Sequence, residues 1–188
     1  MQFELPTATD AELTSVTNRS ELHGEDKVLA LSLGLRISGA NTLLDLLSPE
    51  LRPAIYTKPE GQKSIDGVEE TLPTLRTKHV EQFSLGFAFE GWMLAIEHGI
   101  DEHAPITLCG CKVDKFRLVA KEGGSIELAL RVGTADIDAD RLGVIGMKLG
   151  QMISITLTAP AETVQPDAPK KSRKQRVPTA EEAFAGTA

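Results

Sequence analysis

Four side chains that commonly bind zinc lie close together in the middle of the chain: His98, His103, Cys109 and Cys111. Imidazole nitrogens and thiolates are the usual donors of tetrahedral zinc sites. A single residue separates Cys109 from Cys111, whereas the paired cysteines of zinc fingers and knuckles stand further apart. We therefore predict that the protein folds without metal or cofactor, with the histidines in a solvated loop and the cysteines in a strand. Zinc binding is the alternative.

The acidic residues Asp136, Asp138 and Asp140 have the spacing that opens a calcium-binding loop. The glycine and the distant glutamate that such a loop requires are absent at the proper spacing. The run therefore predicts a solvated turn that leads into a helix. The sequence also has no phosphate-binding loop, dinucleotide fingerprint or nucleophile elbow. We predict a protein that is not an enzyme and has no catalytic residues.

A compact basic cluster lies near the C-terminal end, and its members are Lys170, Lys171, Arg173, Lys174 and Arg176. Such clusters neutralise phosphates or dock acidic partners. They also occur as solvated segments that only keep a chain soluble. We predict that these five residues bind nucleic acid, with the solubilising role as the alternative.

Charge is unevenly distributed along the 188 residues. Residues 1–159 hold 15 Lys or Arg and 23 Asp or Glu, whereas residues 160–188 hold 5 and 4. An acidic body argues against a broad nucleic-acid surface, although a local groove can still be positive. Two cysteines make no disulfide framework, which fits a reducing cytosol. No apolar run approaches the length of a membrane span, so we expect no membrane association.

The segment from Ile106 to Val132 gives the clearest structural signal. Two runs that alternate between apolar and polar residues flank a Lys121-Glu122-Gly123-Gly124 turn. This pattern is typical of a half-buried β-hairpin. One side of the hairpin is predicted to hold Phe116, Leu118, Ala120, Ile126, Leu128, Leu130 and Val132.

A second hairpin is predicted between residues 83 and 96, with Glu90-Gly91 as its turn. Aromatic side chains on strands can stack on nucleic-acid bases. Those of this segment alternate in step with leucine and isoleucine and lack basic neighbours, so we predict core positions for them, Trp92 included. Further strands are predicted over residues 28–37 and 152–158.

Two helices are predicted as well. The first begins at Asn41 as N-cap and carries the leucines of residues 43–47, and Ser48-Pro49 restarts it. The second begins at Asp138 or Asp140 and has an inner face of Leu142, Ile145 and Leu149. Its glycines, at positions 143, 146 and 150, weaken a helix and therefore predict close packing against a sheet.

The remaining segments have little periodicity. Residues 1–26 are predicted to form a loosely ordered arm in which Thr9 and Glu12 cap a short helical turn. Residues 57–81 are predicted to be a long exposed loop, and residues 160–188 a disordered tail. The prediction is thus one α+β domain over residues 1–159. It has about six mainly antiparallel strands, arranged as a curled sheet or a partly open barrel, with two helices.

Three segments, ELTSVTNRSELHGEDKV, ANTLLDLLSPELRPAIY and ITLCGCKV, resemble uncharacterised small proteins of tailed phages and prophages of proteobacteria. The resemblance covers most of residues 11–158. It implies a phage-encoded protein in the cytoplasm of the host bacterial cell, from the early or DNA-metabolism region of a phage genome. It assigns no chemistry to any residue.

Together these observations predict a non-enzymatic accessory protein of phage DNA replication or recombination that binds single-stranded nucleic acid or a phage or host DNA-metabolism protein. The alternative is an inhibitor of host defence or transcription that binds protein through its acidic surface. An electropositive groove with exposed aromatic residues would favour the first function, and a contiguous acidic or apolar patch the second. The sequence leaves the oligomeric state open.

Overall fold

The computed structural model describes residues 3–23, 26–58, 72–97 and 105–160. Within these ranges the main sheet has seven antiparallel strands in the order β5-β7-β6-β9-β1-β2-β8. They are β1 (Leu5–His23), β2 (Asp26–Ala40), β5 (Phe83–Leu85), β6 (Phe89–Ile96), β7 (Ile106–Ala120), β8 (Ser125–Thr134) and β9 (Met152–Thr158).

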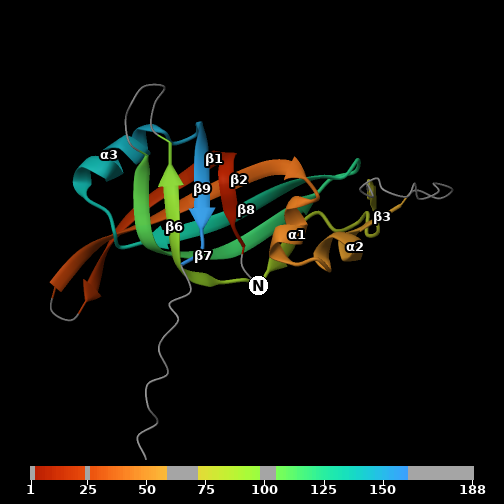
Figure 1. The fold of residues 1–188 in the computed structure, drawn as a ribbon, viewed down its shortest axis with the longest axis horizontal. Helices are drawn as coiled ribbons and strands as arrows, with labels where there is room; N and C mark the ends of the chain where they lie inside the picture. The colour runs from red at the N-terminus through yellow and green to blue at the C-terminus, as the bar shows by residue number, and fades with distance from the viewer. Residues whose placement is uncertain (1–2, 24–25, 59–71, 98–104, 161–188) are drawn as a thin grey trace, which may run out of the picture.

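The sheet closes into a ring because β7 also pairs with β8. Both β5 and β6 pair along the other edge of the long strand β7. The ring is not a regular barrel: β1 and β2 extend past their other neighbours as a two-stranded projection (Figure 1). The predicted α+β fold with a mainly antiparallel, curled sheet is therefore confirmed.

Three short helices accompany the described strands, where the sequence predicted two. They are α1 (Leu43–Leu47), α2 (Leu51–Ile55) and α3 (Ala139–Met147). The helices α1 and α2 lie at one end of the sheet and α3 at the other (Figure 1). A separate two-stranded sheet joins β3 (Tyr56–Thr57) to β4 (Thr74–Leu75). Part of the predicted long loop is thus paired, and its residues 59–71 lie outside the described ranges.

Most of the core lies inside the ring, and a second buried cluster joins one end of β7 and β8 to residues of α1, α2 and β3. The predicted β7–β8 hairpin is confirmed, with Leu118 opposite Leu128 and Ala120 opposite Ile126. Every residue predicted for its inner side is buried, as is Trp92, whose indole N–H donates to the carbonyl of Phe3 at 2.9 Å. The predicted strands at 28–37 and 152–158 are also present, within β2 and β9.

The prediction for the N-terminal arm is wrong over residues 5–23, which form β1 instead of a helical turn. Few of its residues are apolar, but it is paired on both sides, with β2 and with β9. This polar sequence is extended because its backbone is hydrogen-bonded to both neighbouring strands and because Leu5, Ala11 and Leu13 are buried.

The predicted second hairpin is also wrong. Residues 89–96 form one continuous strand, β6, and β5 pairs with β7 instead of β6. Gly91 has a φ of +83° and sits where the β6–β7 register shifts, so it forms a bulge and not a turn. A glycine with positive φ signals either feature, and only the pairing partner distinguishes them.

Two helix boundaries differ from the prediction, and one agrees with it. Asn41 precedes the N-cap residue Thr42, and its buried side chain donates to the carbonyl of Leu72 at 2.8 Å. The N-cap position of α2 is Glu50, two residues after Ser48, and its side chain makes no capping hydrogen bond. The prediction for α3 succeeds at Asp138, which accepts a hydrogen bond from the backbone N–H of Arg141 at 2.8 Å.

The inner face of α3 is only partly as predicted. Ile145 is buried, but Leu149 is 51% exposed because the helix ends at Met147. A Cβ placed on any of the three glycines, at positions 143, 146 and 150, would meet no atom within 4 Å. Close packing therefore does not explain them, and Gly150 instead provides a positive φ of 76° in the turn before β9.

Candidate nucleic-acid interface

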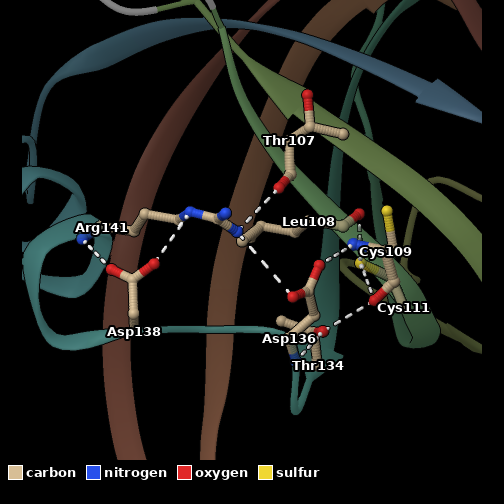
Figure 2. Close-up of polar contacts among 8 residues, drawn as sticks. All are labelled: Thr107, Leu108, Cys109, Cys111, Thr134, Asp136, Asp138 and Arg141. Atoms are coloured by element: carbon tan, nitrogen blue, oxygen red, sulfur yellow. Dashed lines mark hydrogen bonds and ion pairs between the residues drawn. The ribbon is translucent and has the colours of Figure 1, made fainter.

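The aspartate run and the cysteines meet at the start of α3 in a network of structural contacts (Figure 2). Asp136 accepts a hydrogen bond from the backbone N–H of Cys109 at 3.0 Å, and its carboxylate lies 3.8 Å from the Arg141 guanidinium. Arg141 also pairs with Asp138 at 3.1 Å. Asp136 and Asp138 thus anchor the predicted turn into α3, and Arg141 balances part of their charge.

The two cysteines differ in environment. Cys109 is exposed, whereas Cys111 is buried and its thiol donates to the carbonyl of Leu108 at 3.3 Å. Burial raises the pKa of the Cys111 thiol to about 11, so it is a neutral core group and a poor nucleophile. Both lie in β7, as predicted. His98 and His103 lie outside the described residues.

Among the described residues no group of three or more histidines, cysteines, aspartates and glutamates is arranged to hold a metal. Folding without zinc stays a prediction. The five predicted nucleic-acid-binding residues, Lys170, Lys171, Arg173, Lys174 and Arg176, also lie outside the described part of the chain, together with the predicted disordered tail.

The outer side of β2, β8 and β7 carries a surface that the sequence reasoning missed. We call it the basic face and define it by the outward side chains of residues 32–38, 127–133 and 112–119. Its charged members are Arg36, Lys112, Lys115, Arg117 and Arg131, against Asp114 and Glu127. The sign of charge is opposite to that of the whole chain, whose net charge is −7.

Strand register fixes the layout of the basic face in rows. Ala129 of β8 lies between Arg36 of β2 and Arg117 of β7. In the next row Arg131 lies between Gly34 and Asp114. Directly paired residues point to the same side, and neighbouring strands are about 4.8 Å apart. The backbone positions of Arg36 and Arg117 are therefore about 10 Å apart, and only the small side chain of Ala129 lies between them.

The ion pairs of the basic face orient some of its cations. Arg131 donates twice to Asp114, from Nε at 2.7 Å and from Nη2 at 2.5 Å. These hydrogen bonds hold the pKa of Asp114 below its usual value, and Lys115 adds to the effect. Lys112 pairs with Glu90 at 2.7 Å and Arg36 with Glu12 at 3.6 Å. Within the described part of the chain, Lys115 and Arg117 form no ion pair.

A groove of about 290 Å³ opens at the end of the basic face beside the β1–β2 projection. Its walls come from all four neighbouring strands or their ends, and its lining residues are Arg19, Glu21, Ser32, Gly110, Lys112, Arg131, Gly133, Thr134 and Ala135. Arg19 donates to both Glu21 and Ser32. The groove therefore combines three cations with one carboxylate and several small residues.

The aromatic residues are elsewhere. Phe3, Phe89 and Phe116 contact one another, with Phe116 edge-on to the other two rings at centroid distances of 5.4 and 5.9 Å. Phe87 and Trp92 complete this aromatic cluster. Phe3, Phe116 and Trp92 are buried, and Phe87 and Phe89 are partly buried and pack against the core. The predicted core position is thus confirmed for Trp92, whereas Phe83, Phe87 and Phe89 are only partly buried, and the basic face lacks aromatic residues.

No protein-family model matches the chain, and neither the curated proteins nor the solved structures gave a match. Within the described residues no helix is long and apolar enough to span a membrane. The described part of the chain is therefore characterised by its structure alone, as a closed antiparallel ring with a basic outer face.

The basic face can bind phosphates but offers little for catalysis. Its charged groups are arginines, lysines and two ion-paired carboxylates, and Arg and Lys donate hydrogen bonds without accepting them. The thiol of Cys111 is not part of this surface, because it is buried on the inner side of β7. The surface is suited to hold an extended polyanion in place.

Proposed function

We propose that this is a non-enzymatic accessory protein of phage DNA replication or recombination, acting in the cytoplasm of the host cell by binding single-stranded DNA. The observation that carries the proposal is the basic face: five cations and two carboxylates point outward from three adjacent strands of an otherwise acidic protein. Phosphates supply most of the affinity in sequence-independent binding, so a local positive surface is the main requirement.

The basic cluster of residues 170–176 is proposed as a second contact for the same strand. Nine residues lie between Pro160, the end of the described part, and Lys170. If all five cations of the cluster engage phosphates, they contribute about −3.5 to the slope of log K against log salt, at roughly −0.7 per contact on a single strand. The basic face contributes separately to that slope.

The test is a salt titration of the full chain with a labelled single-stranded oligonucleotide. We expect Arg36→Gln with Arg117→Gln to reduce the magnitude of the slope by about 1.4, because two phosphate contacts are lost. Replacing the five cations of residues 170–176 by glutamine should reduce it by about 3.5. Lys78→Gln, at a 68% exposed lysine outside the basic face, is the matched control and should leave the slope unchanged.

If neither the wild-type protein nor the variants bind at low salt, nucleic-acid binding is contradicted. The alternative, an inhibitor that binds a host protein, is favoured by one specific observation: Met147, Leu149 and Met152 are exposed near the end of α3. Exposed apolar groups that gather in one place often mark interaction sites. An inhibitor would need neither the basic face nor residues 170–176.

A further inference from the structure

Three exposed apolar side chains gather where α3 turns into β9. Met147 is 81% exposed, Met152 63% and Leu149 51%. The turn that holds them is tight, because the backbone N–H of Gln151 donates to Lys148 at 3.0 Å and its side chain donates to Met147 at 3.2 Å. Gly150 donates to the carbonyl of Leu13 at 2.8 Å and so fixes the turn to β1. We call these three residues the apolar corner.

The apolar corner is continuous with the basic face. Met152 pairs with Glu12 of β1, and Glu12 pairs in turn with Arg36. One row of outward residues therefore runs across six strands, in the order Met152, Glu12, Arg36, Ala129, Arg117 and Ser84. At about 4.8 Å per strand, Met152 lies roughly 10 Å from Arg36 along this row. Lys148 adds a further cation beside the corner.

We propose that the apolar corner contacts the unpaired bases of a nucleic-acid strand whose phosphates lie on the basic face. This inference rests on the proposed function and assigns a specificity element to it. A single strand presents both phosphates and apolar base surfaces, whereas a duplex hides its base surfaces in the stack. Methionine thioethers pack favourably against aromatic rings. A row with Met152 at one end and Arg36 and Arg117 further along it therefore fits a single strand better than a duplex.

The corner takes the place of the aromatic platform that single-strand-binding surfaces generally use. The aromatic cluster packs against the interior of the closed sheet, and the basic face has no aromatic residue. Contact between bases and Met147, Leu149 or Met152 requires no rearrangement of the core, because all three are already exposed. Glu12 lies on the path, but it is paired with Arg36.

The experiment compares three probes at equal length and low salt on the full chain: a single-stranded oligonucleotide, an abasic strand with the same number of phosphates, and a duplex. The wild-type protein should bind the single strand about two- to twelvefold more tightly than the abasic strand, the range expected for a sulfur–aromatic contact. Replacing Met147, Leu149 and Met152 by serine should remove this preference without changing affinity for the abasic strand. Met93→Ser, at a 42% exposed methionine of β6, is the matched control and should keep the preference.

Equal affinity for single and abasic strands in the wild-type protein, with no effect of the triple variant, would overturn the inference while nucleic-acid binding stands. The apolar corner would then be left as a protein-binding surface. Absence of binding to all three probes at low salt would overturn the proposed function and this inference with it. Circular dichroism of each variant checks that the fold is kept, and at these exposed sites little change in stability is expected.

Discussion

The aromatic cluster and the basic face lie on opposite sides of the same strand. Phe116 is 1% exposed and points into the ring, and its neighbour Arg117 points out of it. Successive side chains of a strand face opposite ways, so one stretch of β7 contributes to both regions. The aromatic residues, the more conspicuous candidates for base stacking, stabilise the ring. The outward surface is made of five cations, two carboxylates and small residues between them.

The largest expected effect is a difference in stability between variants of the neighbours Phe116 and Arg117. Phe116→Ala should lower the free energy of unfolding by about 3–5 kcal/mol, because it removes a buried ring that packs on Phe3 and Phe89. Arg117→Gln should change that free energy by less than about 0.5 kcal/mol. Urea denaturation measures both. A loss below about 1 kcal/mol for Phe116→Ala would show that the inner side of β7 has been misassigned.

A second prediction changes the charge of the basic face without removing a cation. Asp114→Asn frees the Arg131 guanidinium, so affinity for a single-stranded oligonucleotide should rise at neutral pH. Fluorescence anisotropy measures the change. Asp10→Asn, at an exposed aspartate of β1, is the control and should have a smaller effect. Unchanged or weaker binding in Asp114→Asn would argue that Arg131 does not contact phosphate.

The same ion pair gives stability a dependence on pH. Hydrogen bonds from Arg131 lower the pKa of Asp114 in the folded protein below its unfolded value of about 3.9. Stabilisation by the pair is therefore present above that unfolded value and is lost as the pH falls through the lower folded pKa. In Asp114→Asn, unfolding free energy should change less between pH 7 and pH 2 than in the wild type. An unaltered difference would mean that the pair does not contribute.

The smallest effect concerns Lys115, which has a φ of +55° at the bulge of β7. A side chain in this conformation costs roughly 1 kcal/mol. Lys115→Gly should therefore be more stable than Lys115→Ala by about that amount, while both variants bind the oligonucleotide more weakly than wild type because a cation is lost. Equal stability of the two variants would show that the conformation is not strained. Equal binding by all three proteins would place Lys115 outside the interface.

Much of the fold was predictable where the alternation of residues is strong. The hairpin of residues 106–132, the strands in β2 and β9, and the N-cap Asp138 all follow from local patterns. The prediction failed at β1 and at Gly91, because both depend on which strands lie alongside. The polar residues of β1 carry no helical or strand period, and only pairing on both sides makes them extended. Positive φ at Gly91 was foreseeable, but its role as a bulge was not.

The candidate site shows the same division. The sequence alone placed Arg117 and Arg131 on the outer side of one hairpin, since an alternating strand has only two sides. Lys112 shares that side only because the bulge between Asp114 and Arg117 shifts the alternation of β7. It left them unnoticed among 20 basic and 27 acidic residues, because linear charge counts average over opposite faces of the protein. Closure of the ring set Arg36 of β2 beside β8, and the β1–β9 register carried Met152 into the same row. Local alternation decides which way a side chain points, and only long-range strand pairing decides which side chains share a surface.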